Sequence, residues 1–231
     1  MPDTLTREQQ VAVKVKICGV RTPAIIETAA AEGADYVGLV IFEKSPRHVE
    51  VEEARVLAAI ARGKIGTVAV LVDPDDRLLD QVADRVRPDV LQLHGSETPE
   101  RVAAIKARTG LPVMKAIGVR DAADVTKAAA YTKIADMVLF DAKPAPDAAV
   151  PGGAGTTFDW TLLSGVALTA PFALSGGLNP DNVAEAVGLT GASLADVSSG
   201  VESAGEKDAG LVRRFVQAAK AAAPQARAKA S

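Results

Sequence analysis

The only cysteine of the chain, Cys18, ends a short alternating segment, Val13–Cys18, and stands directly before Gly19. Alternate residues of a strand point to opposite faces, so Lys16 and Cys18 share a face and lie about 7 Å apart. A nearby ammonium group favours the thiolate, the form of cysteine that acts as a base or a nucleophile. The segment therefore predicts either a reactive thiol tuned by Lys16 or a small apolar filler, the usual role of a free cysteine.

A second candidate, Asp141, follows the apolar residues Val138–Phe140 at the end of another expected strand. A carboxyl group at this position is well placed to exchange a proton with a substrate at the rim of a site. The same position also suits an aspartate that caps a helix or closes a turn. The loop that follows carries Gly152–Gly155 and Phe158–Trp160, and it fits either a segment that moves over the site or a surface excursion.

Two glycine-bearing segments, Ser175–Asn182 and Ser198–Glu202, each follow an expected strand late in the chain. Glycines allow backbone N–H groups to approach an anion closely, and a helix N-terminus favours negative charge. We expect Asn179 to be the N-cap of the helix after the first segment, with Pro180 at its first position. The pair of segments predicts a phosphate site, although each alone also suits an ordinary tight turn.

Two further side chains can contact a substrate. Arg47, in S-P-R, can hold a planar carboxylate through two hydrogen bonds, although most loop arginines are solvated surface residues. His94 ends the apolar run of L-Q-L-H-G-S-E and suits a contact at the rim of a site or a structural role. No cluster of histidines and carboxylates has the spacing of a metal site, and no G-x-G-x-x-G opens the first strand–helix unit. We therefore expect no metal and no dinucleotide.

Short β-branched segments alternate with Ala-, Glu- and Arg-rich segments of helical spacing, the pattern of parallel strands joined by helices. The expected strands are Val13–Cys18, Asp35–Ile41, Thr67–Val72, Val90–His94, Val113–Ile117, Met137–Phe140, Phe172–Leu174 and Ala195–Val197. The expected helices include Pro23–Glu32, Val51–Ala61, Arg77–Arg87, Glu97–Arg108, Ala122–Ala130, Asp181–Val187 and Asp208–Ala222. Their number and regular spacing favour a single (β/α)₈ TIM barrel over an open, doubly wound sheet.

No linker with a shift in composition divides the chain, so we expect one barrel domain over residues 13–222. Residues 1–12 are expected to form a loose arm. The Ala-rich residues 223–231 are expected to be a disordered tail.

The composition excludes several classes of protein. Apolar residues make up 48% of the chain and aromatic residues only 3%, which suits sheets covered by Ala-rich helices. A net charge of -3 and a pI near 5.5 argue against a general nucleic-acid surface. One cysteine excludes an intrachain disulfide and fits a reducing cytoplasm. Neither a secretory signal nor a transmembrane segment is visible, so we expect no membrane partner.

Several motifs, in order over about residues 14–215, resemble those of phosphoribosylanthranilate isomerases. They are K-I-C-G (Lys16–Gly19), G-A-D-Y-V-G (Gly33–Gly38), S-P-R (Ser45–Arg47), L-Q-L-H-G-S-E (Leu91–Glu97), L-F-D-A (Leu139–Ala142), G-G-A-G with F-D-W, S-G-G-L-N-P-D-N-V (Ser175–Val183) and D-V-S-S-G-V-E with G-E-K-D (Asp196–Glu202, Gly205–Asp208). Each motif is weak alone, whereas the ordered set on consecutive strand–helix units is specific.

The resemblance implies a (β/α)₈ barrel without a cofactor, active as a monomer or homodimer on a phosphorylated sugar. The implied reaction is the Amadori rearrangement of N-(5-phosphoribosyl)anthranilate to 1-(2-carboxyphenylamino)-1-deoxyribulose 5-phosphate, in tryptophan biosynthesis. The family's motifs make Cys18 the general base and Asp141 the general acid. Arg47 is expected to face the anthranilate carboxylate, and His94 to lie at the rim. The phosphate is expected at Gly176, Gly177, Ser199 and Gly200.

Two alternatives stay open. A related histidine-pathway isomerase runs the same rearrangement on a substrate with two phosphates, and is expected to carry an aspartate where this chain has Cys18. A non-catalytic barrel that only binds a sugar phosphate would keep its ligand after loss of Cys18 and Asp141.

Overall fold

Eight parallel strands close into a barrel in the computed structural model, which describes residues 13–143, 157–163 and 171–222. The strands are β1 (Lys14–Cys18), β2 (Tyr36–Val40), β3 (Gly66–Leu71), β4 (Val90–Leu93), β5 (Val113–Val119), β6 (Met137–Ala142), β7 (Phe172–Leu174) and β8 (Leu194–Val197). Each strand pairs with the next one in sequence, and β8 returns to pair with β1. The expected single barrel is therefore confirmed.

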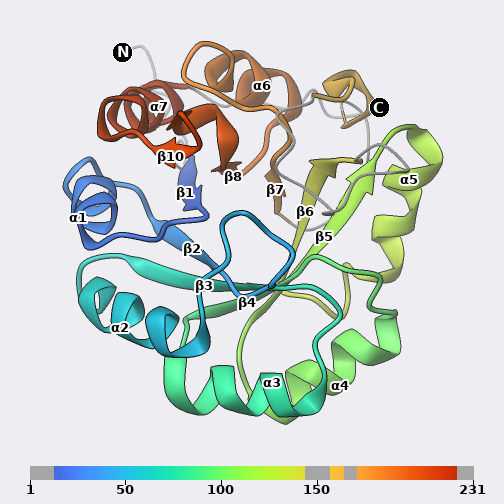
Figure 1. Cartoon of the computed structure of the whole chain (residues 1–231). Coiled ribbons are helices and arrows are strands. Elements are labelled where there is room, and N and C mark those ends of the chain that lie inside the picture. The colour runs from blue at the N-terminus through green and yellow to red at the C-terminus, as the bar shows by residue number, and fades with distance from the viewer. Residues whose placement is uncertain (1–12, 144–156, 164–170, 223–231) are drawn as a thin grey trace, which may run out of the picture.

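Helices form a ring around the strands (Figure 1). They are α1 (Pro23–Ala31), α2 (Val51–Ala61), α3 (Asp76–Gln81), α4 (Pro99–Thr109), α5 (Ala122–Lys127), α6 (Val183–Thr190) and α7 (Ala209–Ala221). Short turns of other helix types extend or replace them: η1 (Val82–Val86), η2 (Ala128–Ala130), η3 (Trp160–Leu163) and η4 (Ser199–Val201). After η4, β9 (Glu202–Ser203) and β10 (Glu206–Lys207) make a small antiparallel hairpin. Within the described residues, no helix is both long enough and apolar enough to cross a membrane.

The alternation of the strands divides the core into two parts. Outward-facing residues such as Val15, Leu91 and Phe140 pack under the helices in one large apolar cluster. The inward faces form two smaller clusters, one of which contains Cys18 beside Val40 and Val68. Successive side chains of a strand point to opposite faces of the sheet. The polar residues that alternate with the outward-facing ones therefore point into the barrel.

The expected start of the helix after β7 was wrong. Asn179 instead caps a separate turn before the helix, where its side-chain oxygen accepts hydrogen bonds from the backbone N–H groups of Asp181 and Asn182. This turn separates the glycines from the helix, and α6 begins only at Val183, with Asn182 as its N-cap residue. The Asn182 side chain donates instead to the carbonyl of Gly177, at 3.0 Å, and so ties the turn to the glycine segment. Side-chain competition for backbone groups explains the difference.

Other expectations fall outside the described residues. They are the loose arm over residues 1–12, the tail over residues 223–231 and the glycine run Gly152–Gly155.

Candidate active site

Lys16 enters the barrel from β1 and is fully buried. Its ammonium donates to both carboxylate oxygens of Asp196, each at 2.9 Å, from the neighbouring strand β8. Burial lowers the pKa of Lys16, but the interactions with Asp196 and Cys18 together outweigh burial and raise that pKa, so the lysine stays charged. A buried cation needs such a partner. Asp196 was not predicted as a site residue, although its position between the outward-facing Ala195 and Val197 places it on the inner face of β8.

Cys18 lies on the same face of β1, beside Lys16, at 9% exposure. Burial raises the pKa of the Cys18 thiol, and the ammonium groups of Lys16 and Lys207 lower it without cancelling that effect. Lys16 thus acts toward the thiolate, as expected of an adjacent ammonium, while burial in the barrel favours the neutral form and has the larger effect.

Asp141 points into the barrel from β6 and is 4% exposed. One carboxylate oxygen accepts from the backbone N–H of Ala142 at 2.9 Å, and the other lies 3.1 Å from Nε2 of His94. Nδ1 of His94 in turn lies 2.9 Å from the amide nitrogen of Gln92. Asp141 is therefore no helix cap, and His94 contacts the proposed acid directly.

Asp196 connects the two halves of this site electrostatically. Its carboxylate raises the pKa of Cys18, and its own protonation depends on the charges of Asp141 and His94 as well as on Lys16. The thiol on β1 and the carboxyl group on β6 therefore both interact with one buried ion pair.

Arg47 is held by Glu202 from the hairpin at the far end of the chain. Nε donates to one carboxylate oxygen at 2.7 Å and Nη2 to the other at 2.8 Å, a bidentate pair. The Arg47 side chain is 14% exposed, so it is not a solvated surface residue. Glu202 was not predicted as the partner of Arg47, because nothing local joins residues separated by 155 positions.

Lys207 completes this cluster. Its ammonium donates to Glu202 and, at 3.2 Å, to the carbonyl of Ser198. Burial alone raises the pKa of Glu202, but hydrogen bonds from Arg47 and Lys207 outweigh burial and lower it to about 2. Glu202 is therefore ionised at any ordinary pH and fixes the two cations.

The glycine segments after β7 and β8 pack backbone against backbone. A Cβ at Gly200 would stand 1.9 Å from the carbonyl oxygen of Leu178, and one at Gly176 would stand 2.6 Å from the backbone nitrogen of Ala142. Gly176 and Gly177 also have left-handed backbones, with φ of 88° and 64°. Ser199 opens η4 next to this contact. The four residues expected to bind phosphate thus belong to two loops in direct contact.

Among the described residues, no three histidine, cysteine or carboxylate side chains are grouped as a metal site requires. The site instead contains the thiol of Cys18, the Asp141–His94 pair and two glycine-rich loops. It also contains three cations held by carboxylates: Lys16, Arg47 and Lys207. These groups can move protons at two points of a bound anionic molecule.

The chain resembles known proteins along almost all of its length. The family model described as N-(5'phosphoribosyl)anthranilate (PRA) isomerase matches residues 15–218. A relative named N-(5'-phosphoribosyl)anthranilate isomerase, from Paramagnetospirillum magneticum, is 53% identical over 213 residues, covering 92% of this chain and 99% of the relative. A crystal structure of phosphoribosyl anthranilate isomerase from Thermotoga maritima is 35% identical, with a TM-score of 0.81, covering 90% and 98% of the two chains. Another solved structure, with 33% identity, a TM-score of 0.79 and coverage of 90% and 98%, is a complex with reduced 1-(o-carboxyphenylamino)-1-deoxyribulose 5-phosphate.

Proposed function

Because the chain belongs to the N-(5'-phosphoribosyl)anthranilate isomerase family, we propose that Cys18 and Asp141 are the base and the acid of its reaction. The enzyme is an aldose–ketose isomerase of tryptophan biosynthesis. Its reaction is the Amadori rearrangement of N-(5-phosphoribosyl)anthranilate to 1-(2-carboxyphenylamino)-1-deoxyribulose 5-phosphate. We propose the cytoplasm as its location.

Asp141 protonates the ring oxygen of the ribose in the first step. The C1–O bond then breaks, and the nitrogen lone pair forms the C1=N bond of an open-chain iminium ion. This step needs a carboxyl group that is protonated in part of the molecules. The short contact with His94 supports this role, because the imidazole can share or exchange that proton.

Cys18 removes the proton from C2 in the second step, since the iminium group makes that hydrogen acidic. The electron pair of the C2–H bond forms the C1=C2 bond of an enolamine, which becomes the ketone when C1 takes up a proton and the C2 hydroxyl loses one. The thiolate is the competent base, and Lys16 stabilises it. The raised pKa of Cys18 means that thiolate formation, and with it the rate, increases with pH.

The substrate is proposed to lie across the mouth of the barrel. Its phosphate contacts Gly176, Gly177, Ser199 and Gly200, whose two loops pack against each other and follow the barrel strands at which this fold commonly binds phosphate. Its anthranilate carboxylate is directed toward Arg47, whose guanidinium has five N–H donors and is already oriented by Glu202.

The observation that carries this assignment is that β1 and β6 bring one thiol and one carboxyl group to the inner face of the barrel, around the Lys16–Asp196 ion pair. The test generates phosphoribosylanthranilate in situ and follows the loss of its fluorescence. Cys18→Ala and Asp141→Asn are each expected to lower kcat by roughly two or more orders of magnitude. Full activity in either variant contradicts the role assigned to that residue, and an inactive, folded wild type contradicts the substrate.

The enzyme is proposed to act as a monomer or homodimer. Light scattering at the assay concentration measures which of the two is present.

A further inference from the structure

Gln92 is a buried residue for which the proposed acid–base chemistry gives no role. It lies on the inward face of β4 with 1% exposure, two residues before His94. Its amide nitrogen is 2.9 Å from Nδ1 of His94, whereas its amide oxygen has no hydrogen-bond partner among the described residues. A buried carbonyl without a partner costs about 1–3 kcal/mol, so an apolar side chain would be favoured here unless the oxygen has a use.

The hydrogen bond to Gln92 determines where His94 carries its proton. An amide NH₂ group can only donate, so Nδ1 of His94 must accept. A neutral imidazole whose Nδ1 accepts carries its hydrogen on Nε2, and that nitrogen faces the Asp141 carboxylate at 3.1 Å. The observed orientation therefore belongs to the form in which His94 and Asp141 share one proton and Asp141 is ionised.

The acid form of the site requires one more proton. With two protons, either the Asp141 carboxyl group donates to Nε2 while Nδ1 keeps a hydrogen, or an imidazolium donates to the carboxylate. Nδ1 carries a hydrogen in both cases and must then find an acceptor. The Gln92 amide supplies one if it turns over, because a half-turn exchanges its nitrogen and its unpartnered oxygen.

We propose that Gln92 is a positioning residue whose amide turns over as the His94–Asp141 pair takes up and releases the proton used in catalysis. The inference rests on the assignment of Asp141 as the acid. It gives the unpartnered oxygen a role and explains why an amide, with one donor and one acceptor side, suits this place better than a hydrocarbon or a carboxylate.

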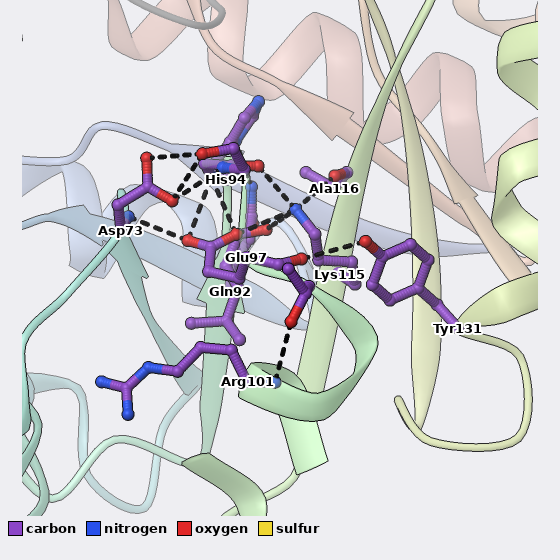
Figure 2. Close-up of polar contacts among 12 residues, drawn as sticks. Asp73, Gln92, His94, Glu97, Arg101, Lys115, Ala116 and Tyr131 are labelled. Carbon is purple, nitrogen blue, oxygen red and sulfur yellow. Dashed lines mark hydrogen bonds and ion pairs between the residues drawn. The ribbon is translucent and has the colours of Figure 1, made fainter. Parts of the chain in front are cut away.

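The surrounding structure fixes the backbone that carries the imidazole, so we expect the amide to be the part that adjusts. The carboxylate of Glu97 accepts from the backbone N–H groups of Asp73 and Gly95 (Figure 2). Lys115 lies 2.9 Å from Glu97 and donates to the carbonyl of Gly95 at 2.8 Å. These buried charges fix the backbone directly after His94.

The lysine also fixes the backbone before His94, since it lies 3.3 Å from the Leu93 carbonyl. The backbone N–H of His94 itself donates to Leu71 on β3 at 2.8 Å. The backbone that carries the imidazole is therefore fixed on both sides of His94.

The other charged groups around the pair come from neighbouring strands. Asp196 on β8 interacts with both His94 and Asp141, and Lys16 on β1 neutralises much of its charge. Cys18 lies beside that ion pair, while Lys115 and Glu97 compensate each other behind β4. These are the charged groups that face the pair, and none of them contacts the Gln92 amide in the described residues.

Histidine nitrogen NMR tests the proposal without substrate, and therefore independently of the assigned reaction. The chain has two histidines, so selective ¹⁵N labelling gives few signals. His48 is an internal reference, because its Nδ1 accepts from the backbone N–H of Phe42 at 3.0 Å. The variant His48→Gln identifies its signals. For His94 we expect hydrogen on Nε2 alone in the one-proton form, and on Nδ1 once the pair gains its second proton.

Two variants of similar size separate the donor and acceptor functions of the amide. Gln92→Met removes both, so we expect mixed tautomers of His94, kcat lower by about tenfold and KM within about twofold of wild type. Gln92→Glu leaves only an acceptor, so we expect Nδ1 to keep its hydrogen to higher pH and the kcat–pH profile to shift upward. Circular dichroism establishes that both variants are folded.

Three results would overturn the proposal. One is a wild-type His94 with hydrogen on Nδ1 across the whole pH range. The second is unchanged His94 signals in both folded variants. The third is a KM increase with an unchanged pH profile, which would make Gln92 a residue that only shapes the pocket. Failure of the assigned reaction is seen separately, as retained activity in Asp141→Asn.

Discussion

Gly38 provides the space that the thiol of Cys18 occupies. The two residues are paired across β1 and β2, and a Cβ at Gly38 would stand 2.9 Å from Sγ of Cys18. The same atom would stand 3.1 Å from Nζ of Lys16, so the thiol and the ammonium group converge over this glycine. The absence of a side chain at Gly38 on β2 thus leaves space for the thiol and the ammonium group of β1.

Replacing Gly38 by alanine should therefore displace the thiol. We expect Gly38→Ala to fold, to lose about 1–3 kcal/mol of stability through overpacking, and to lower kcat by about tenfold or more. Thermal melting and the fluorescence assay measure the two effects. Gly188→Ala is the matched control, because a Cβ there meets no atom within 4 Å. Equal activity of the two variants would show that the thiol does not depend on this space.

The pH dependence of the reaction should report the state of Cys18. Its pKa is raised by burial and lowered by Lys16, so activity should increase with pH as the thiolate forms. Removing Lys16 should move this increase to higher pH. The single variant leaves Asp196 buried without a partner, at a cost of about 3–5 kcal/mol, so Lys16→Met/Asp196→Asn is the variant to use.

Alkylation measures the same ionisation directly, since Cys18 is the only cysteine of the chain. The pH dependence of its reaction with iodoacetamide should shift upward in the double variant, together with the rate profile. The shift is the net of two losses, since Lys16 lowers the pKa of the thiol and Asp196 raises it. Identical profiles in wild type and double variant would contradict a net effect of the ion pair on the thiol.

The Arg47–Glu202 pair should matter for substrate binding. In Glu202→Gln the guanidinium loses its bidentate carboxylate partner, so we expect KM to increase by about tenfold while kcat changes less. Glu206→Gln is the control from the same hairpin, because Glu206 is exposed and pairs with Arg21. A similar KM in the two variants would remove Arg47 and Glu202 from the binding site.

The same pair should stabilise the fold in a predictable pH range. The pKa of Glu202 is about 2 in the folded chain, below its ordinary value of about 4.3. A lowered carboxylate pKa stabilises the fold above the unfolded pKa, and this contribution disappears as the pH falls toward 2. It is at most about 3 kcal/mol. Wild type should therefore melt above Glu202→Gln at pH 6, and the difference should shrink at pH 2.5. A difference that does not depend on pH would contradict this account.

The contact between the two glycine loops should control phosphate affinity. Gly200→Ala forces a Cβ against the carbonyl of Leu178 and must push the loops apart. We expect KM to increase by about tenfold, with a parallel loss of inhibition by inorganic phosphate. Ser203→Ala, at an exposed position of the same hairpin region, should leave phosphate inhibition unchanged. Unchanged inhibition in Gly200→Ala would place the phosphate elsewhere.

The sequence by itself determined the strands and what each presents to the barrel interior. Strand side chains alternate with a period of two, so Lys16 and Cys18 had to share a face, and Asp141 had to lie at a strand end. The regular succession of strands and helices indicated the barrel, because parallel neighbours need helical crossovers. These conclusions follow from local geometry and do not require knowledge of distant contacts.

The partners of these residues were decided only by the tertiary structure. Closure of β8 against β1 brings Asp196 to Lys16 across 180 positions, and the hairpin after η4 brings Glu202 to Arg47. Such pairs depend on the order and tilt of all strands around the ring, which no local pattern contains. Burial of the thiol is likewise decided by the tertiary structure, because the whole barrel excludes water from Cys18. Burial raises the pKa of Cys18, although the adjacent Lys16 alone would lower it.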